Sequence, residues 1–203
     1  MNYGETRERL VRTAIELFAQ RGYDGTSIRA ITQAAGANLG AVTYHFGSKA
    51  ALFDACLALV VAPFRDRIAA HARAPGAPLD RIDGILRTFF DYLSEQPALP
   101  ALLLQVLVTP RHMPAAAREG FAANHAAIAD LIAAGQRAGS IRAGDPRLMA
   151  LSVATQPVML TLVRRVLSQA IGVDQDDASV RAQVVDSVAT FVRAGLRSGV
   201  DTP

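Results

Sequence analysis

The chain has one cysteine, one lysine and no tryptophan among its 203 residues. The single cysteine, Cys56, excludes an internal disulfide and any multi-cysteine metal site. It lies in an apolar stretch, where a free cysteine behaves as a small buried hydrophobe. The sequence contains no HExxH pattern, no glycine-rich phosphate loop and no GxSxG nucleophile motif. We therefore expect a protein that is not an enzyme and that holds no metal ion and no cofactor.

Long apolar runs are also missing. The longest, ACLALVVAPF, covers residues 55–64 and ends at Arg65, whereas a membrane-spanning helix needs about 20 apolar residues. The first 14 residues carry charges of both signs and no uninterrupted apolar segment, which argues against a secretory signal peptide. We expect a cytoplasmic protein with no membrane partner.

The residues that are present favour a helical globular protein. Hydrophobic residues make up 51% of the chain and charged residues 19%, with a net charge of +3. Such a charge is compatible with an anionic partner but does not demand one. Apolar residues recur every three or four positions, and alternating strand patterns are absent, so we predict an all-α fold of about nine helices. The expected helices cover residues 5–20, 28–34, 38–44, 48–72, 79–94, 97–108, 114–138, 145–170 and 177–197.

Three local signals set the expected helix boundaries. Gly22 can take the left-handed conformation that ends the first helix, and Ser48 can cap the long fourth helix. Pro63 lies inside that fourth helix and should kink or divide it. Helices are short before residue 48 and long and apolar after it, so we expect a domain of residues 1–48 joined to a second domain of residues 49–203.

The two short helices suggest a helix-turn-helix unit. They are joined by a turn that contains Gly36, as in the helix-turn-helix plan. The apolar positions expected to lock them together are Ile28, Ile31, Ala35, Val42 and Phe46. The other face of the second helix could then enter a DNA major groove.

Residues 17–55, LFAQRGYDGTSIRAITQAAGANLGAVTYHFGSKAALFDA, carry a family resemblance. The RGYDGTS segment, the AAG turn, the G-x-V-T-Y-H-F core and the following SK resemble the DNA-binding region of TetR/AcrR-type transcriptional regulators. The resemblance implies a ligand-responsive repressor that a small, largely apolar effector releases from a pseudo-palindromic operator. It also implies a homodimer with a helical ligand-binding and dimerisation domain after the head. The alternatives are an activator of the same family, a helical interaction protein that has lost DNA binding, and, disfavoured by the missing catalytic groups, a small helical hydrolase.

Three residues depart from the family pattern. Leu39 and Thr43 stand where polar or tyrosine side chains are common, which puts the operator sequence in doubt. Ala51 stands where a glutamate often completes a capping box with Ser48.

The resemblance and the side-chain chemistry together predict the DNA contacts. Leu39 and Thr43 would meet bases, while Tyr44, His45 and Lys49 would hold phosphates. The alternatives are a core leucine, a packed tyrosine and a structural histidine. The full predicted set is Thr26, Ser27, Arg29, Asn38, Leu39, Gly40, Ala41, Thr43, Tyr44, His45 and Lys49.

Two further sets are expected after residue 48, although all their members could be ordinary core. The candidate lining of a ligand pocket is Phe64, Phe89, Phe90, Tyr92, Gln105, Met113, Phe121, His125, Gln156 and Met159. The apolar stripes of the last two predicted helices suit a two-fold interface formed by Met149, Val153, Pro157, Leu160, Val184, Val188 and Phe191.

Overall fold

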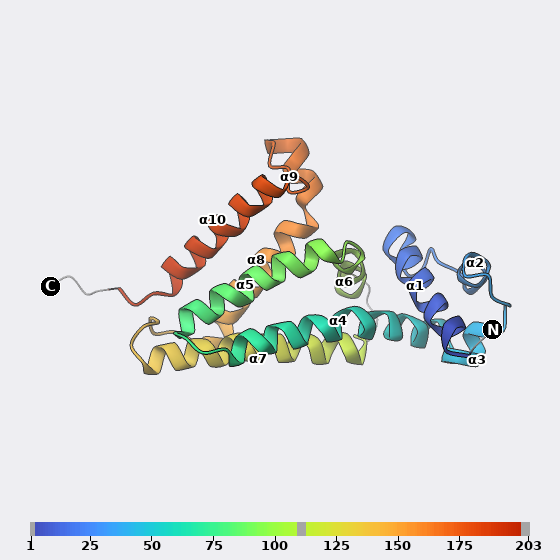
Figure 1. Cartoon of the computed structure of the whole chain (residues 1–203), viewed down its shortest axis with the longest axis horizontal. Helices are drawn as coiled ribbons and strands as arrows, with labels where there is room; N and C mark the ends of the chain where they lie inside the picture. Colours follow the sequence, from blue (N-terminus) through green and yellow to red (C-terminus); the bar gives the residue numbers. More distant parts are fainter. Residues whose placement is uncertain (1–2, 109–112, 200–203) are drawn as a thin grey trace. The chain divides into compact units, whose positions relative to one another are not determined.

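The computed structural model describes residues 3–108 and 113–199, and these residues are organised as helices with one isolated bridge, between Ile141 and Arg197 (Figure 1). The all-α prediction is confirmed. The helices are α1 (Tyr3–Arg21), α2 (Ile28–Ala34), α3 (Ala41–Phe46), α4 (Lys49–Arg73), α5 (Pro78–Glu95), α6 (Ala98–Val108), α7 (Ala115–Arg137), α8 (Pro146–Leu162), α9 (Arg164–Ile171) and α10 (Ala178–Leu196).

The chain divides into two compact units. The head unit comprises Met1–Pro63 and Gln96–Gly120, and the bundle unit comprises Phe64–Glu95 and Phe121–Pro203. Helix α4 is continuous through Pro63, so this proline does not divide the helix, and the boundary between the units follows it directly. The head unit thus holds more of the chain than the segment 1–48 that we expect to bind DNA.

The head unit is built around α1. Leu10, Ala14 and Phe18 are fully buried on one face of this helix, as the three- and four-residue spacing predicts. The helix ends where Gly22 takes a φ of 72° and its N–H donates to the carbonyl oxygen of Phe18 at 3.0 Å. Helix α6 packs against α1, which brings residues from beyond position 96 into the head unit.

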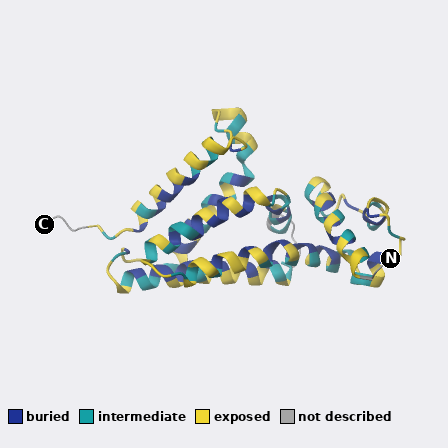
Figure 2. Cartoon of the chain, in the orientation of Figure 1, coloured by how far each residue is buried: buried dark blue, intermediate teal, exposed yellow. Residues whose placement is uncertain are grey.

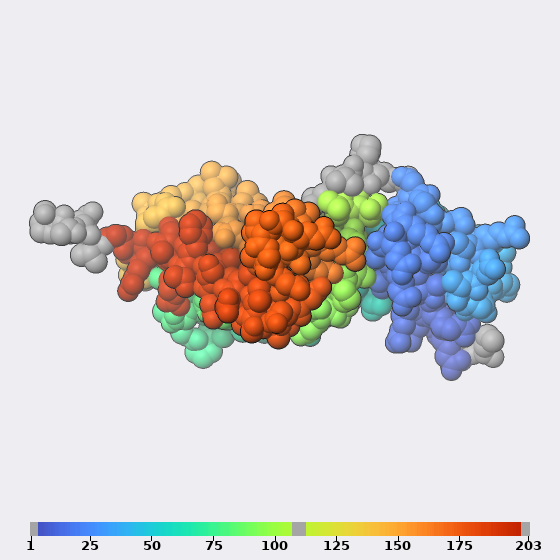
Figure 3. Space-filling view, turned by 90° about the horizontal axis from the view of Figure 1, so that it is seen from above, coloured from blue at the N-terminus to red at the C-terminus, as the bar shows by residue number. Residues whose placement is uncertain are grey.

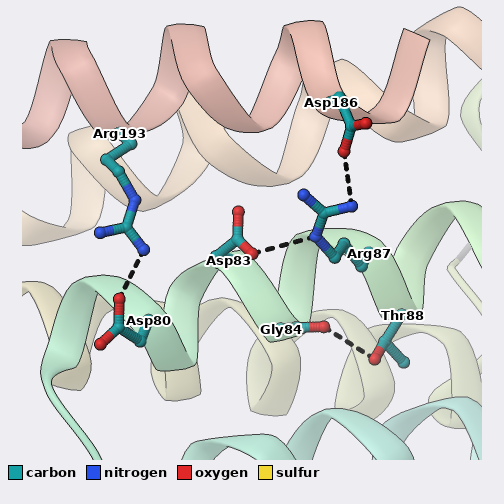
Figure 4. A network of polar contacts seen from close by, with 7 residues as sticks. All are labelled: Asp80, Asp83, Gly84, Arg87, Thr88, Asp186 and Arg193. Carbon is teal, nitrogen blue, oxygen red and sulfur yellow. Dashed lines mark hydrogen bonds and ion pairs between the residues drawn. The ribbon is translucent and has the colours of Figure 1, made fainter. Parts of the chain in front are cut away.

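In the bundle unit, α5 packs against α8 and α10. Ion pairs along the α5–α10 contact accompany the apolar packing (Figure 4). Arg193 of α10 lies 2.6 Å from Asp80 of α5, while Arg87 lies 3.0 Å from Asp83 and 2.8 Å from Asp186 of α10. Hydrogen bonds to Asp186 and Asp83 raise the pKa of Arg87. Exposed pairs of this kind contribute about 0–1 kcal/mol each, so they fix the alignment of α10 more than its stability.

The prediction of one helix over residues 145–170 is wrong. Helix α8 ends at Leu162, and α9 begins at Arg164 after a bend of 66°. The apolar spacing runs on across Val163, whose φ of −93° and ψ of 10° interrupt the helix, so periodicity alone could not reveal the break. This division makes ten helices in residues 3–108 and 113–199 where about nine were expected.

No single described helix has both the length and the apolar composition to cross a membrane; the bent pair of α8 and α9 meets both criteria only when the two helices are counted together.

Candidate DNA-reading surface

Helices α2 and α3 form a helix-turn-helix with a closed core. Ile31 of α2 and Val42 of α3 are fully buried, and Ala35 is 6% exposed. The turn between them uses Gly36 at a φ of 59°, a left-handed conformation that favours glycine. Ser27 caps α2 by accepting a hydrogen bond from the Ala30 N–H at 3.1 Å. The two helices are therefore held rigidly by local packing, as the sequence predicts.

The opposite side of this unit exposes large side chains. Leu39 is 62% exposed and Tyr44 is 74% exposed, and Thr43 also faces solvent. The expected helix from residue 38 instead begins at Ala41, so Leu39 lies in the turn that precedes α3. Leu39 and Tyr44 thus lie exposed on the side of the unit away from its buried core, which makes this side the candidate contact surface. We call residues 38–40, 43 and 44 the reading surface.

Two of the predicted DNA-contact residues, Thr26 and Ala41, are buried. Thr26 is fully buried, and its hydroxyl lies 2.8 Å from the carbonyl oxygen of Gly22 and 3.1 Å from that of Leu17. Its backbone N–H also has a partner, the carbonyl oxygen of Tyr23 at 3.3 Å. Ala41 is 6% exposed and packs inward at the start of α3. Both residues build the head rather than present groups to DNA.

Basic and aromatic groups flank the reading surface. The rings of Tyr44 and His45 meet edge to face at a centroid distance of 5.0 Å. The Lys49 ammonium lies 4.2 Å from the centroid of the Tyr23 ring, a cation–π contact that orients this only lysine. The next helix, α4, begins at Lys49, and its first turn is capped by Ser48, which accepts from the Ala51 N–H at 3.1 Å. Ser27, Arg29 and Asn38 are exposed as well.

Part of the predicted ligand set gathers in the bundle unit. The Phe64 ring meets Phe89 edge to face at 4.7 Å and stacks on Tyr92 at 5.0 Å. All three are buried, as is Phe90 of α5. The Arg67 guanidinium lies over the Tyr92 ring, 4.9 Å from its centroid. Burial is the largest cause of the raised pKa of Tyr92.

The other predicted lining residues are not part of this aromatic cluster. Gln105 belongs to the head unit, where its Oε1 accepts from the Tyr23 N–H at 3.4 Å, and Met113 belongs to the same unit. Phe121 and Met159 are each 56% exposed. The Gln156 amide bonds back to the Ser152 carbonyl oxygen of its own helix at 3.1 Å.

His125 also lies apart from the aromatic cluster. Its ring stacks on Phe121 at 6.2 Å, and its Nε2 lies 2.9 Å from the Arg147 carbonyl oxygen. These contacts place His125 at the junction between α7 and the start of α8.

Most of the predicted dimer residues are buried within the single chain. Met149, Val153, Pro157 and Val188 are buried within a single chain because α8 packs against α5 and α10. Leu160 and Val184 are half-buried, and Phe191 alone of the predicted set is exposed, at 69%. The apolar stripes of α8 and α10 are buried faces that pack within the single chain.

The sequence reasoning missed Asn124 of α7. It is 9% exposed, and its Oδ1 has no hydrogen-bond partner. A buried amide oxygen without a donor costs about 1–3 kcal/mol. The sequence signal that could have indicated this residue is an asparagine within an alanine-rich helix. Within residues 3–108 and 113–199, no three His, Cys, Asp or Glu side chains are grouped to hold a metal ion.

Comparison with known proteins places the head in a family. Residues 10–56 match the family described as bacterial regulatory proteins, tetR family. The HTH-type transcriptional regulator AcrR of Shigella flexneri is 35% identical over 83 residues, which is 40% of this chain and 39% of that protein. The HTH-type transcriptional repressor NicS of Pseudomonas putida is 25% identical over 95% of this chain and 92% of its own. The chain spans less than half the length of the first curated relatives that it matches.

Solved structures share the fold over nearly the whole chain. The transcriptional regulator FadR of Bacillus subtilis, solved in complex with stearoyl-CoA, superposes with a TM-score of 0.77 at 16% identity, covering 93% of this chain and 98% of that one. The closed core of α2 and α3 defines a helix-turn-helix unit, and nearly the whole chain shares its all-helical fold with that structure. The head, over residues 10–56, is similar to the DNA-binding region of TetR/AcrR-type regulators.

Proposed function

We propose that the chain binds a pseudo-palindromic operator through its reading surface and represses transcription until a small, largely apolar effector releases it. The observation that carries the proposal is the exposure of Leu39 and Tyr44 beside the fully buried Ile31 and Val42. Leu39 and the Thr43 methyl group offer apolar contacts to thymine methyls, and the Thr43 hydroxyl suits a base edge. Gly40 lets the backbone approach closely.

The surrounding polar groups suit the DNA backbone. The Tyr44 hydroxyl and a ring N–H of His45 can each donate to a phosphate oxygen, which fixes register without reading sequence. Lys49 and Arg29 add positive charges, and the neutral side chains of Ser27 and Asn38 can donate hydrogen bonds to phosphate oxygens. A regulator that binds operator DNA acts in the cytoplasm of a bacterium, where that DNA lies.

Selection from a random duplex library with the purified chain tests operator binding. We expect enrichment of an inverted repeat whose half-sites lie about 34–36 Å apart, or a multiple of this spacing, because a two-fold dimer presents two reading surfaces. A library that stays random after several rounds would favour the alternative of a helical interaction protein.

We propose a homodimer formed by the exposed sides of α8 and α10. Leu151 and Met159 of α8 and Phe191 of α10 are large apolar side chains exposed on the bundle unit. Figure 3 shows α10 and the segment around α9 at the surface on this side, and α9 has no buried residue (Figure 2). We propose these exposed residues for the interface in place of the predicted residues that are buried within one chain. A two-fold contact would bury the same residues on both subunits.

We propose that the effector binds in the bundle unit, within the domain of residues 49–203. The Phe64, Phe89 and Tyr92 cluster supplies the apolar surroundings that small-molecule sites use. Asn124 supplies an acceptor that lacks a donor. FadR of Bacillus subtilis holds stearoyl-CoA, which agrees with a largely apolar effector here.

A binding assay with the selected duplex tests the effector. We expect small apolar compounds that raise the melting temperature of the chain also to weaken its complex with the duplex, because an effector must prefer the state that binds DNA poorly. Replacing Asn124 by leucine should reduce the thermal shift of compounds that carry a hydrogen-bond donor. Compounds that stabilise the chain and strengthen the complex would instead identify an activator or a co-repressor mechanism.

A further inference from the structure

A surface groove lies between α1 and α4 in the head unit. Its volume is about 440 Å³, within the range of about 300–1,000 Å³ in which small-molecule sites fall. Both helices contribute to it through residues one turn apart. The lining residues are Arg7, Glu8, Val11, Arg12, Ala55, Ala58 and Leu59.

Close packing of the two helices supports the base of this groove. Val11 is 4% exposed, and the Sγ of the buried Cys56 lies 3.6 Å from the Val11 carbonyl oxygen. The wall from α4 is apolar: Ala55 and Ala58 leave space because their side chains are short, and Leu59 is 53% exposed. The groove thus has an apolar wall that solvent can reach.

The wall from α1 is charged and carries an excess of positive charge. The α1 lining holds two arginines, Arg7 and Arg12, and one carboxylate, that of Glu8. The Glu8–Arg12 pair is long, at 4.0 Å, and its side chains are 71% and 77% exposed, so the pair contributes little. A ligand carboxylate would accept hydrogen bonds from these guanidinium groups, and hydrogen bonds in which both partners are charged are stronger than neutral ones.

We propose that this groove binds a small amphipathic carboxylate, with its chain against Ala55, Ala58 and Leu59 and its carboxylate between Arg7 and Arg12. This site is additional to the effector site proposed for the bundle unit. The Arg7 guanidinium also lies 5.2 Å from the centroid of the Phe46 ring, at the last residue of α3. A carboxylate that draws Arg7 into the groove would therefore alter the packing at the end of the helix that carries Thr43 and Tyr44.

A tryptophan reporter tests the groove directly, because the chain has no tryptophan of its own. Leu59→Trp places the indole at the groove, and the exposure of Leu59 lets the head tolerate it. Titration of the full chain with decanoate, below its micellar concentration, should give a saturable blue shift. Decanol has the same chain length without the charge and should bind about tenfold more weakly, the value of a charged hydrogen bond.

Two charge variants and one reporter control decide the outcome. In the Leu59→Trp background, Arg12→Ala should weaken decanoate binding about tenfold, and Glu8→Gln should strengthen it. Val166→Trp, at an exposed site of α9, should give no saturable shift. Equal binding of decanoate and decanol, insensitivity to both charge variants, or the same curve from Val166→Trp would overturn the proposal.

Discussion

The thiol of Cys56 shows how burial sets the chemistry of a single residue. Cys56 is fully buried, and burial raises its pKa from 9.0 to about 12. Three tenfold steps in acidity lower the thiolate fraction at pH 7 about a thousandfold, and the thiolate is the reactive form. We expect Ellman's reagent to leave the native chain unmodified over a time in which the chain in denaturant reacts fully. Fast reaction of the native chain would show that α1 and α4 separate readily at this point.

Other residues show where prediction from the sequence ends. Spacing alone predicts Ile31 and Val42 as core, because two apolar faces must meet in any helix-turn-helix, and both are buried. Thr26 looks in sequence like the exposed cap Ser27, its neighbour. Only the folded chain shows that the Thr26 hydroxyl turns inward to the Gly22 carbonyl oxygen. Polar residues at a helix start have two possible partners, backbone and ligand, and sequence does not choose between them.

At the scale of the helix, the start of α8 predicts a dependence of stability on pH. The Asp145 carboxylate accepts a hydrogen bond from the backbone N–H of Arg147 at 2.9 Å. It also forms an ion pair with the Arg147 guanidinium at 2.8 Å. These contacts, the side-chain bond first, lower the pKa of Asp145 to about 2. A carboxyl group whose pKa falls on folding stabilises the folded state at pH values above its unfolded pKa, here 3.8. That stabilisation is lost as the pH falls towards the folded pKa of about 2.

Thermal unfolding of Asp145→Ala tests this cap. We expect the melting temperature to fall by about 2–4 °C at pH 7, and this difference should shrink between pH 4 and pH 2. Asp91→Ala, at an exposed position of α5, is the matched control and should change little. A difference for Asp145→Ala that stays constant down to pH 2 would contradict the cap.

Helix boundaries can be predicted from the sequence where a residue's own chemistry sets them. Gly22 and Ser48 end and begin helices as their chemistry predicts. The break at Val163 has no glycine or proline at that position to announce it. The buried stripes of α8 and α10 were predicted, but whether they face α5 or a second chain depends on the tertiary fold.

At the scale of the whole molecule, the proposed homodimer predicts a charge-sensitive association. Phe191→Glu places two carboxylates near a two-fold axis, since an isologous contact repeats each residue. We expect the dimer to weaken at least about tenfold in sedimentation equilibrium. Leu104→Glu, at an exposed apolar residue of α6, should leave association unchanged. A wild-type chain that sediments as a monomer at all concentrations would rule out the interface.

DNA binding through the reading surface is tested most directly by fluorescence anisotropy with the selected duplex and a scrambled duplex. Leu39→Ala should bind the selected duplex about 1–3 kcal/mol more weakly and the scrambled one unchanged, because a base contact carries sequence information. Tyr44→Phe should weaken both duplexes by a similar factor, as expected for a phosphate contact. Leu104→Ala should match the wild type. If all three variants bind both duplexes as the wild type does, this surface does not read DNA.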